Sequence, residues 1–234
     1  MDENAQLHVQ LLLKQKAALR EASKRKGQLP KNRPTKTAVV QRFMMNLAQS
    51  FMQSSAGWHT VRTSFIPPPY LPCTKPLCEL QKILIRNLRL ETSHRGSFLL
   101  ARVLTPPDRM TGIIAIVEDE KDDVMLLQLY QQEDENLKPA VEILSPGMVV
   151  VVKEPYFKQT SDGGYGLRVD HVGDILWLRQ GNEMIPGKWA PRFTDLDKTA
   201  MMWKEEGNRA VARKEFWKSI EWLVSLSYQR FFCQ

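Results

Sequence analysis

Residues able to perform metal or nucleophilic chemistry are few in this sequence, and they are scattered. The three cysteines and four histidines share no metal-ligand spacing, whereas a structural zinc ion needs a complete tetrahedral set of ligands. The acidic residues 119–123 lack the glycine and the distal glutamate of a calcium-binding loop. We therefore predict no catalytic residue, no metal site and no bound cofactor, with the cysteines as free thiols in a reducing compartment.

A glycine-rich turn and a charged pair follow each other later in the chain. Residues 161–166, Ser-Asp-Gly-Gly-Tyr-Gly, predict a tight hairpin turn, because Asp-Gly is a strong hairpin signal. They lack the helix N-terminus that phosphate-binding loops use. Arg168 and Asp170 alternate onto one face of the following strand, so we predict a cross-strand ion pair there. An acid/base pair would need a nucleophile, and no serine or cysteine is placed for one.

Positive charge gathers near the N-terminus. The net charge is +7, and residues 1–50 hold ten Lys/Arg against three Asp/Glu, so the remaining residues are neutral overall. The densest basic cluster contains Lys24, Arg25, Lys26, Lys31 and Arg33. Such a cluster is typical of nuclear-import signals and nucleic-acid contacts, and equally of a solvated charged face. Both interpretations stay open.

Two helices and a connector account for the first part of the chain. Apolar residues recur at threes and fours over 4–26, where Gly27 ends the pattern, and a second helix runs from Thr35 or Thr37 to about residue 53. We assign 1–55 to a basic helical arm and 56–85 to a proline-rich connector. Its polyproline II run is a stiff strap into the next domain, or a ligand for an aromatic groove of another protein.

Short apolar runs organise the region 86–180. They are rich in Val, Ile and Leu and bounded by Pro, Gly and Asp: 97–104, 110–117, 124–130, 148–153 and 166–178, with a short helix within 133–144. This order is typical of a five-stranded Greek-key barrel like the oligonucleotide-binding fold. The acidic residues 119–123 form an exposed hairpin tip in this interpretation. The expected core contains Leu100, Val103, Ile114, Ile116, Leu127, Leu129, Val150, Val152, Val169 and Ile175.

The barrel carries a weak signal for nucleic acid. Nucleic-acid-binding barrels expose aromatic and basic side chains on their middle strands, but the second and third runs here are almost wholly aliphatic. Tyr156, Phe157 and Lys158, on the fourth strand, are the aromatic and basic mixture that the barrel offers.

Residues 191–234 predict a helical module. One helix covers 198–213 and a second begins at Phe216. Trp203 and Gly207 match the opening of a tetratricopeptide repeat, although the pattern fades after Leu223; a plain helical hairpin is the alternative. The predicted fold class is thus α+β, with N-terminal helices, a five-stranded OB-like β-barrel and a C-terminal TPR-like helical hairpin.

Several stretches resemble one protein family. They are Pro67–Pro72, Asn87–Thr92, His94–Ser97, Leu127–Glu133, Lys153–Lys158 and Asp162–His171, together with the repeat opening at Trp203. Over about 67–220 the chain resembles the N-terminal half of fungal proteins in which tetratricopeptide repeats precede a SET domain. The resemblance implies a protein-lysine methyltransferase that uses S-adenosylmethionine. No residues here resemble the catalytic SET motifs, and the chain ends within its first repeat, which suggests a truncated or misread end.

The repeat resemblance singles out Lys204 and Asn208. In chaperone-adaptor repeats, a Lys and an Asn at these positions grip the C-terminal carboxylate of an acidic peptide, and one helical turn allows both to donate to it. The alternative is an exposed lysine beside an asparagine that packs between the helices.

Our first functional expectation is a non-enzymatic protein-interaction module that binds a protein partner through the helical repeat. A nucleic-acid or chromatin-binding module, weakly supported by the arm or the barrel, is the first alternative. A protein-lysine methyltransferase whose SET domain is absent from this chain is the second. No apolar run is long enough to span a membrane and no signal peptide is visible, so we expect the cytoplasm or nucleus. The oligomeric state is not predicted.

Overall fold

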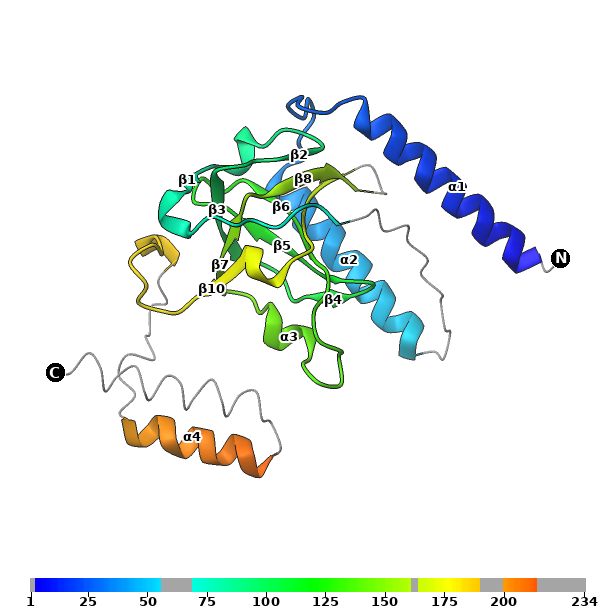
Figure 1. Ribbon diagram of the computed structural model, residues 1–234. Coiled ribbons are helices and arrows are strands. Elements are labelled where there is room, and N and C mark those ends of the chain that lie inside the picture. The colour runs from blue at the N-terminus through cyan, green and yellow to red at the C-terminus, as the bar shows by residue number, and fades with distance from the viewer. Residues whose placement is uncertain (1–2, 56–68, 161–163, 190–199, 214–234) are drawn as a thin grey trace. The chain divides into compact units, whose positions relative to one another are not determined.

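A computed structural model describes residues 3–55, 69–160, 164–189 and 200–213 (Figure 1). The chain divides into two compact units, Met1–Arg179 and Gln180–Gln234, and each is considered by itself. Within the described residues, the first unit contains three α-helices and all the strands. Among the described residues, no helix is long and apolar enough to cross a membrane.

The two predicted N-terminal helices are confirmed as α1 (Glu3–Ser23) and α2 (Lys36–Ser55). The hydroxyl of Thr35 accepts a hydrogen bond from the backbone N–H of Ala38 at 3.3 Å, which is an N-cap for α2. Lys36 then forms an ion pair with the fully buried Glu118. This pair fastens the start of α2 to the sheet, and α2 packs against β5 and β6 (Figure 1).

The strands form one mixed sheet. Their bounds are β1 Gln81–Lys82, β2 Thr92–Ser93, β3 Ser97–Val103, β4 Asp108–Arg109, β5 Ile113–Glu118, β6 Val124–Leu129, β7 Val149–Lys153, β8 Tyr156–Gln159, β9 Tyr165–Val169 and β10 Ile175–Leu178. Their order is β10-β7-β3-β5-β6-β9-β8-β2, with β1 beside β3 and β4 beside β5. β6 pairs in parallel with β9, and β8 returns antiparallel along β9.

The predicted closed five-stranded barrel is wrong. The sheet has ten strands and is open, with β10 and β2 at its ends. Two-residue strands such as β1, β2 and β4 are too short to show alternation, so the sequence did not reveal them. The predicted fourth strand continues into a separate strand, β8, beyond Glu154 and Pro155, and proline cannot donate a hydrogen bond to a ladder. The helix within 133–144 is reduced to α3 (Ala140–Ile143).

The apolar core is formed largely by the side chains at the inward-facing positions of these strands. Seven expected core residues belong to it: Val103, Leu127, Leu129, Val150, Val152, Val169 and Ile175. Leu100 and Ile116 are also buried, outside this cluster. Ile114 is only partly buried, because strand alternation places it on the opposite face from Ile113 and Ala115. That opposite face carries the site described below.

The predicted C-terminal hairpin is also wrong for the part of the chain that is described. Only one helix stands there, α4 (Ala200–Ala212); the second helix predicted from Phe216 lies outside the described residues. Gly207 and Ala210 are buried and the helix carries exposed residues around them. A short 3-10 helix, Gly187–Trp189, precedes α4 in the same unit.

Candidate binding cavity

A cavity of about 860 Å³ lies between the N-terminal helices and the outer face of the sheet. α2 supplies one wall through Val39, Arg42 and Phe43, while β5 and β6 supply the other. Alternation along β6 turns Leu126 and Gln128 outward to the cavity while Leu127 and Leu129 enter the core. A cavity of this size suits a small molecule.

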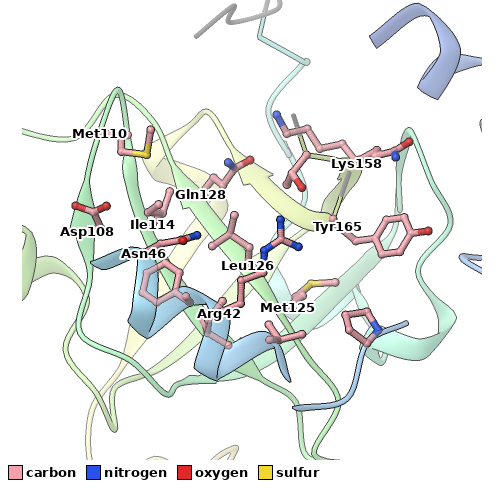
Figure 2. A pocket seen from close by; sticks show the side chains of 18 of the residues that line it. Arg42, Asn46, Asp108, Met110, Ile114, Met125, Leu126, Gln128, Lys158 and Tyr165 are labelled. Atoms are coloured by element: carbon pink, nitrogen blue, oxygen red, sulfur yellow. The ribbon is translucent and has the colours of Figure 1, made fainter. Parts of the chain in front are cut away.

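Polar groups enter the cavity from both walls. Figure 2 shows Gln128 and Lys158 along one side, with Arg42 extending from α2 toward them. The side-chain oxygen of Gln128 is buried and has no hydrogen-bond partner among the residues that the structure describes. Burial, and after it the positive charge of Arg168, lower the pKa of Lys158 below its usual value. The cavity therefore combines a partly buried cation with an unsatisfied amide.

A buried ion pair lies beside the wall that contains Gln128 and Lys158. One partner is on β9 and the other follows the end of that strand. Arg168 Nε lies 2.7 Å from Asp170 Oδ1, and both side chains are almost fully buried. The predicted ion pair is confirmed, although it forms between neighbours on one face rather than across strands. The Arg168 guanidinium also lies over the ring of Tyr130, 5.4 Å from its centroid. Asp170 in turn accepts a hydrogen bond from the backbone N–H of Tyr70 at 3.4 Å.

The basic cluster does not form one exposed patch. Arg25 reaches the hydroxyl of Tyr165 at 3.3 Å. Arg33 donates to the carbonyl of Ile85 at 2.9 Å and stacks over the ring of Phe157 at 5.3 Å. Lys24 pairs with Glu21 on the surface, and both Lys26 and Lys31 are exposed. Two of the five candidate nucleic-acid contacts thus attach the arm to the sheet, and the contact itself stays a prediction.

The candidate peptide-binding pair lies in the other unit. Lys204 and Asn208 are both exposed and stand one turn apart on α4. Their common face permits the predicted joint contact to a carboxylate. Nothing further in the described residues tests this prediction.

The cavity was not predicted from the sequence. Lys158 was noticed for its aromatic neighbours, but Gln128 and Arg42 were not singled out. The available signal was a polar residue at an outward position of an otherwise aliphatic strand, which is where Gln128 stands on β6. Within the described residues, no group of three or more His, Cys, Asp or Glu is placed to hold a metal ion.

Comparisons with known proteins give one informative relative. The chain is 40% identical over 213 residues to a curated protein from the fungus Gibberella zeae named "Methyltransferase"; the match covers 91% of this chain and 27% of that protein. The chain thus spans about a quarter of the relative's length. No protein-family model matches.

A structural comparison adds no argument. A crystal structure from Leishmania major, assigned as an aspartyl-tRNA synthetase, matches with a TM-score of 0.31 and 17% identity. The match covers 47% of this chain and 22% of that chain. A likeness this weak supports no statement about fold or function.

The fungal relative corrects the first functional expectation. A protein named as a methyltransferase, 40% identical over most of this chain, points to an enzyme, so the expectation of a non-enzymatic chain is wrong. It gives no support to tetratricopeptide repeats or to a repeat-based interaction module. The resemblance to a fungal methyltransferase is confirmed at this coarser level.

Proposed function

We propose that this chain is a section of a methyltransferase, and that the complete enzyme methylates protein lysine. One observation carries the proposal, the 40% identity over 213 residues with the Gibberella zeae methyltransferase. The choice of lysine as the acceptor rests on the resemblance of the chain to SET-type proteins. Because the match covers 27% of the relative, we propose methyl transfer for the complete enzyme and assign no step of it to residues of this chain.

S-adenosylmethionine, the methyl donor implied for such an enzyme, does not fit the cavity. It carries a sulfonium and an ammonium against a single carboxylate, so it is a cation overall. The charged residues lining the cavity are Glu21, Arg33, Arg42, Asp108 and Lys158. Three of these side chains are basic and two are acidic, so the lining is also positively charged overall. Lys158 would repel the sulfonium at close range. We therefore derive no catalytic step from these residues.

A chimera tests the proposal. The section of the Gibberella zeae protein that aligns with this chain is replaced by residues 1–234, and the product is incubated with tritiated S-adenosylmethionine and a mixed protein extract. We expect the chimera to label protein, with methyl-lysine recovered after hydrolysis. A matched pair of variants, Leu127→Asp in the core and Val141→Asp on the surface, separates loss of this fold from a mere surface change.

The outcomes are distinct. Activity that survives in the parent chimera and in Val141→Asp, but is lost in Leu127→Asp, supports a folded section that the enzyme requires. A chimera that is folded by circular dichroism but transfers no methyl, beside an active parent enzyme, contradicts the proposal. Label found only on residues other than lysine contradicts the choice of acceptor.

A further inference from the structure

We propose that the cavity between α2 and the outer face of β6 and β8 binds a small organic anion with an apolar body. The charged group of the ligand lies beside Lys158, and a hydrogen-bond donor of the ligand binds the side-chain oxygen of Gln128. The cavity belongs entirely to the unit Met1–Arg179. The proposal does not depend on methyl transfer, because it concerns a ligand of opposite charge to the methyl donor.

Lys158 supplies the charge. Within the described residues, its ammonium takes part in no hydrogen bond or ion pair, while Arg168 nearby already pairs with Asp170. Glu91 and Asp170 are the carboxylates whose charge acts on Lys158. Glu91 accepts hydrogen bonds from the Tyr156 hydroxyl and the Gln159 N–H, and Asp170 is held by Arg168. The wall is therefore left with a cation that an entering anion would neutralise.

Gln128 supplies a second and independent contact. Its side-chain oxygen is buried without a partner in the described part of the chain, and buried polar groups in proteins are nearly always hydrogen-bonded. Gln128 stands opposite Arg168 in the parallel β6–β9 pairing, and Arg168 stands opposite Tyr156 on β8. Gln128 and Lys158 thus face one cavity from strands on either side of β9. A ligand that carries a hydrogen-bond donor beside its anionic group can therefore bind the Lys158 ammonium and the Gln128 oxygen together.

Apolar side chains define the rest of the ligand. Phe43 and Val39 from α2 face Leu126 and Ile114 from the sheet. The volume of about 860 Å³ lies within the range of cavities that hold drug-sized molecules. Burial of apolar surface against these walls favours a hydrophobic or aromatic body. A bare inorganic ion would leave most of the cavity unfilled.

Two fluorescent probes separate charge from shape. 1-Anilinonaphthalene-8-sulfonate is an aromatic anion, and N-phenyl-1-naphthylamine has the same ring system without the sulfonate. In titrations of the full chain, we expect one anionic probe to bind per chain and to bind at least about tenfold more tightly than the neutral probe. Equal affinities for the two probes would overturn the proposed role of Lys158.

Variants locate the probe. Lys158→Met should weaken binding of the sulfonate about tenfold and leave the neutral probe unchanged, whereas Lys153→Met, a partly buried lysine on β7 outside the cavity, should change neither. Leu126→Trp places a larger side chain in the cavity, between α2 and the sheet, and should weaken both probes. If Lys158→Met does not fold, Leu126→Trp still decides: unchanged binding of both probes in that variant overturns the proposal.

Competition identifies the anionic group. Phenyl phosphate and benzoate are titrated against the bound sulfonate in the same fluorescence assay. Displacement by phenyl phosphate alone indicates a phosphate-bearing ligand, and displacement by benzoate alone indicates a carboxylate; either result supports an anion site. Failure of both, with displacement by the neutral probe, shows an apolar cavity without anion binding and overturns the proposal.

Discussion

At the scale of single residues, Asp119 shows how a charged tip can become part of the interior. Residues 119–123 were expected to be exposed, yet Asp119 is only 1% exposed. Its carboxylate accepts hydrogen bonds from the backbone N–H groups of Ile85 at 2.8 Å, Lys121 at 2.8 Å and Asp123 at 3.2 Å. The carboxylate thus closes its own hairpin and attaches it to the short helix Ile85–Asn87.

Removal of that carboxylate should therefore destabilise the fold. We expect Asp119→Ala to lower the free energy of unfolding by about 2–4 kcal/mol, since it leaves buried N–H donors unpaired. Glu120→Ala is the matched control, because Glu120 pairs with Lys82 at the surface and should cost less than about 1 kcal/mol. Urea unfolding measures both; equal losses would show that the Asp119 contacts contribute little.

Glu154 gives the fold a dependence on pH. Burial alone would raise its pKa, but hydrogen bonds from the Gly96 N–H and from Arg95 outweigh it and hold the pKa of Glu154 below its usual value of 4.5. Because the folded pKa is depressed, the carboxylate stabilises the fold above pH 4.5, and this contribution is lost as pH falls through the folded pKa. The stabilisation is therefore complete at neutral pH.

The substitution Glu154→Gln tests this linkage. We expect it to lower the free energy of unfolding by about 1–3 kcal/mol at pH 7, and the difference from the parent chain to shrink steadily below pH 4.5. Urea unfolding from pH 7 to pH 3 gives both curves. A difference that is constant over this range would assign the loss to packing and not to the ionised carboxylate.

At the scale of elements, β6 has one face in the core and the other in the cavity. Leu127 is fully buried, whereas Leu126 is partly buried and lines the cavity. Leu127→Ala should cost about 2–4 kcal/mol, and Leu126→Ala should cost much less because its surroundings are already open. Chemical unfolding of the pair measures the contrast. Similar costs for both would mean that α2 closes tightly over the outer face.

The sequence predicted those elements whose pattern is long enough to be periodic. The helical spacing of α1 and α2 and the apolar runs of β3, β5, β6 and β7 were all visible. The two-residue strands were not, because pairing with a neighbour rather than local preference creates them. The cavity was also not predictable, since Lys158 and Gln128 come to line the same cavity only when β8 and β6 flank β9. Asp119 was misjudged because its donors include Ile85, from a segment distant in the sequence.

At the scale of the whole molecule, the main core lies within a single unit. Every member of its apolar cluster falls between Ile85 and Ile175, inside Met1–Arg179. A chain ending at Arg179 should therefore fold by itself and unfold in urea at the same midpoint as the first unit of the full chain. Near-UV circular dichroism and urea unfolding check this. A loss of cooperativity in the shortened chain would show that the second unit is needed for the core.

The anchoring of the arm by Arg25 has a consequence for synthesis on the ribosome. Arg25 binds Tyr165, 140 positions later in the chain, and Arg33 binds the carbonyl of Ile85. At roughly 5–20 residues per second, about 7–28 s separate the emergence of Arg25 from that of its partner. During that interval Arg25 has no Tyr165 to bind, and α1 has no β8 to pack against. The nascent arm is therefore the segment on which a chaperone has longest to act.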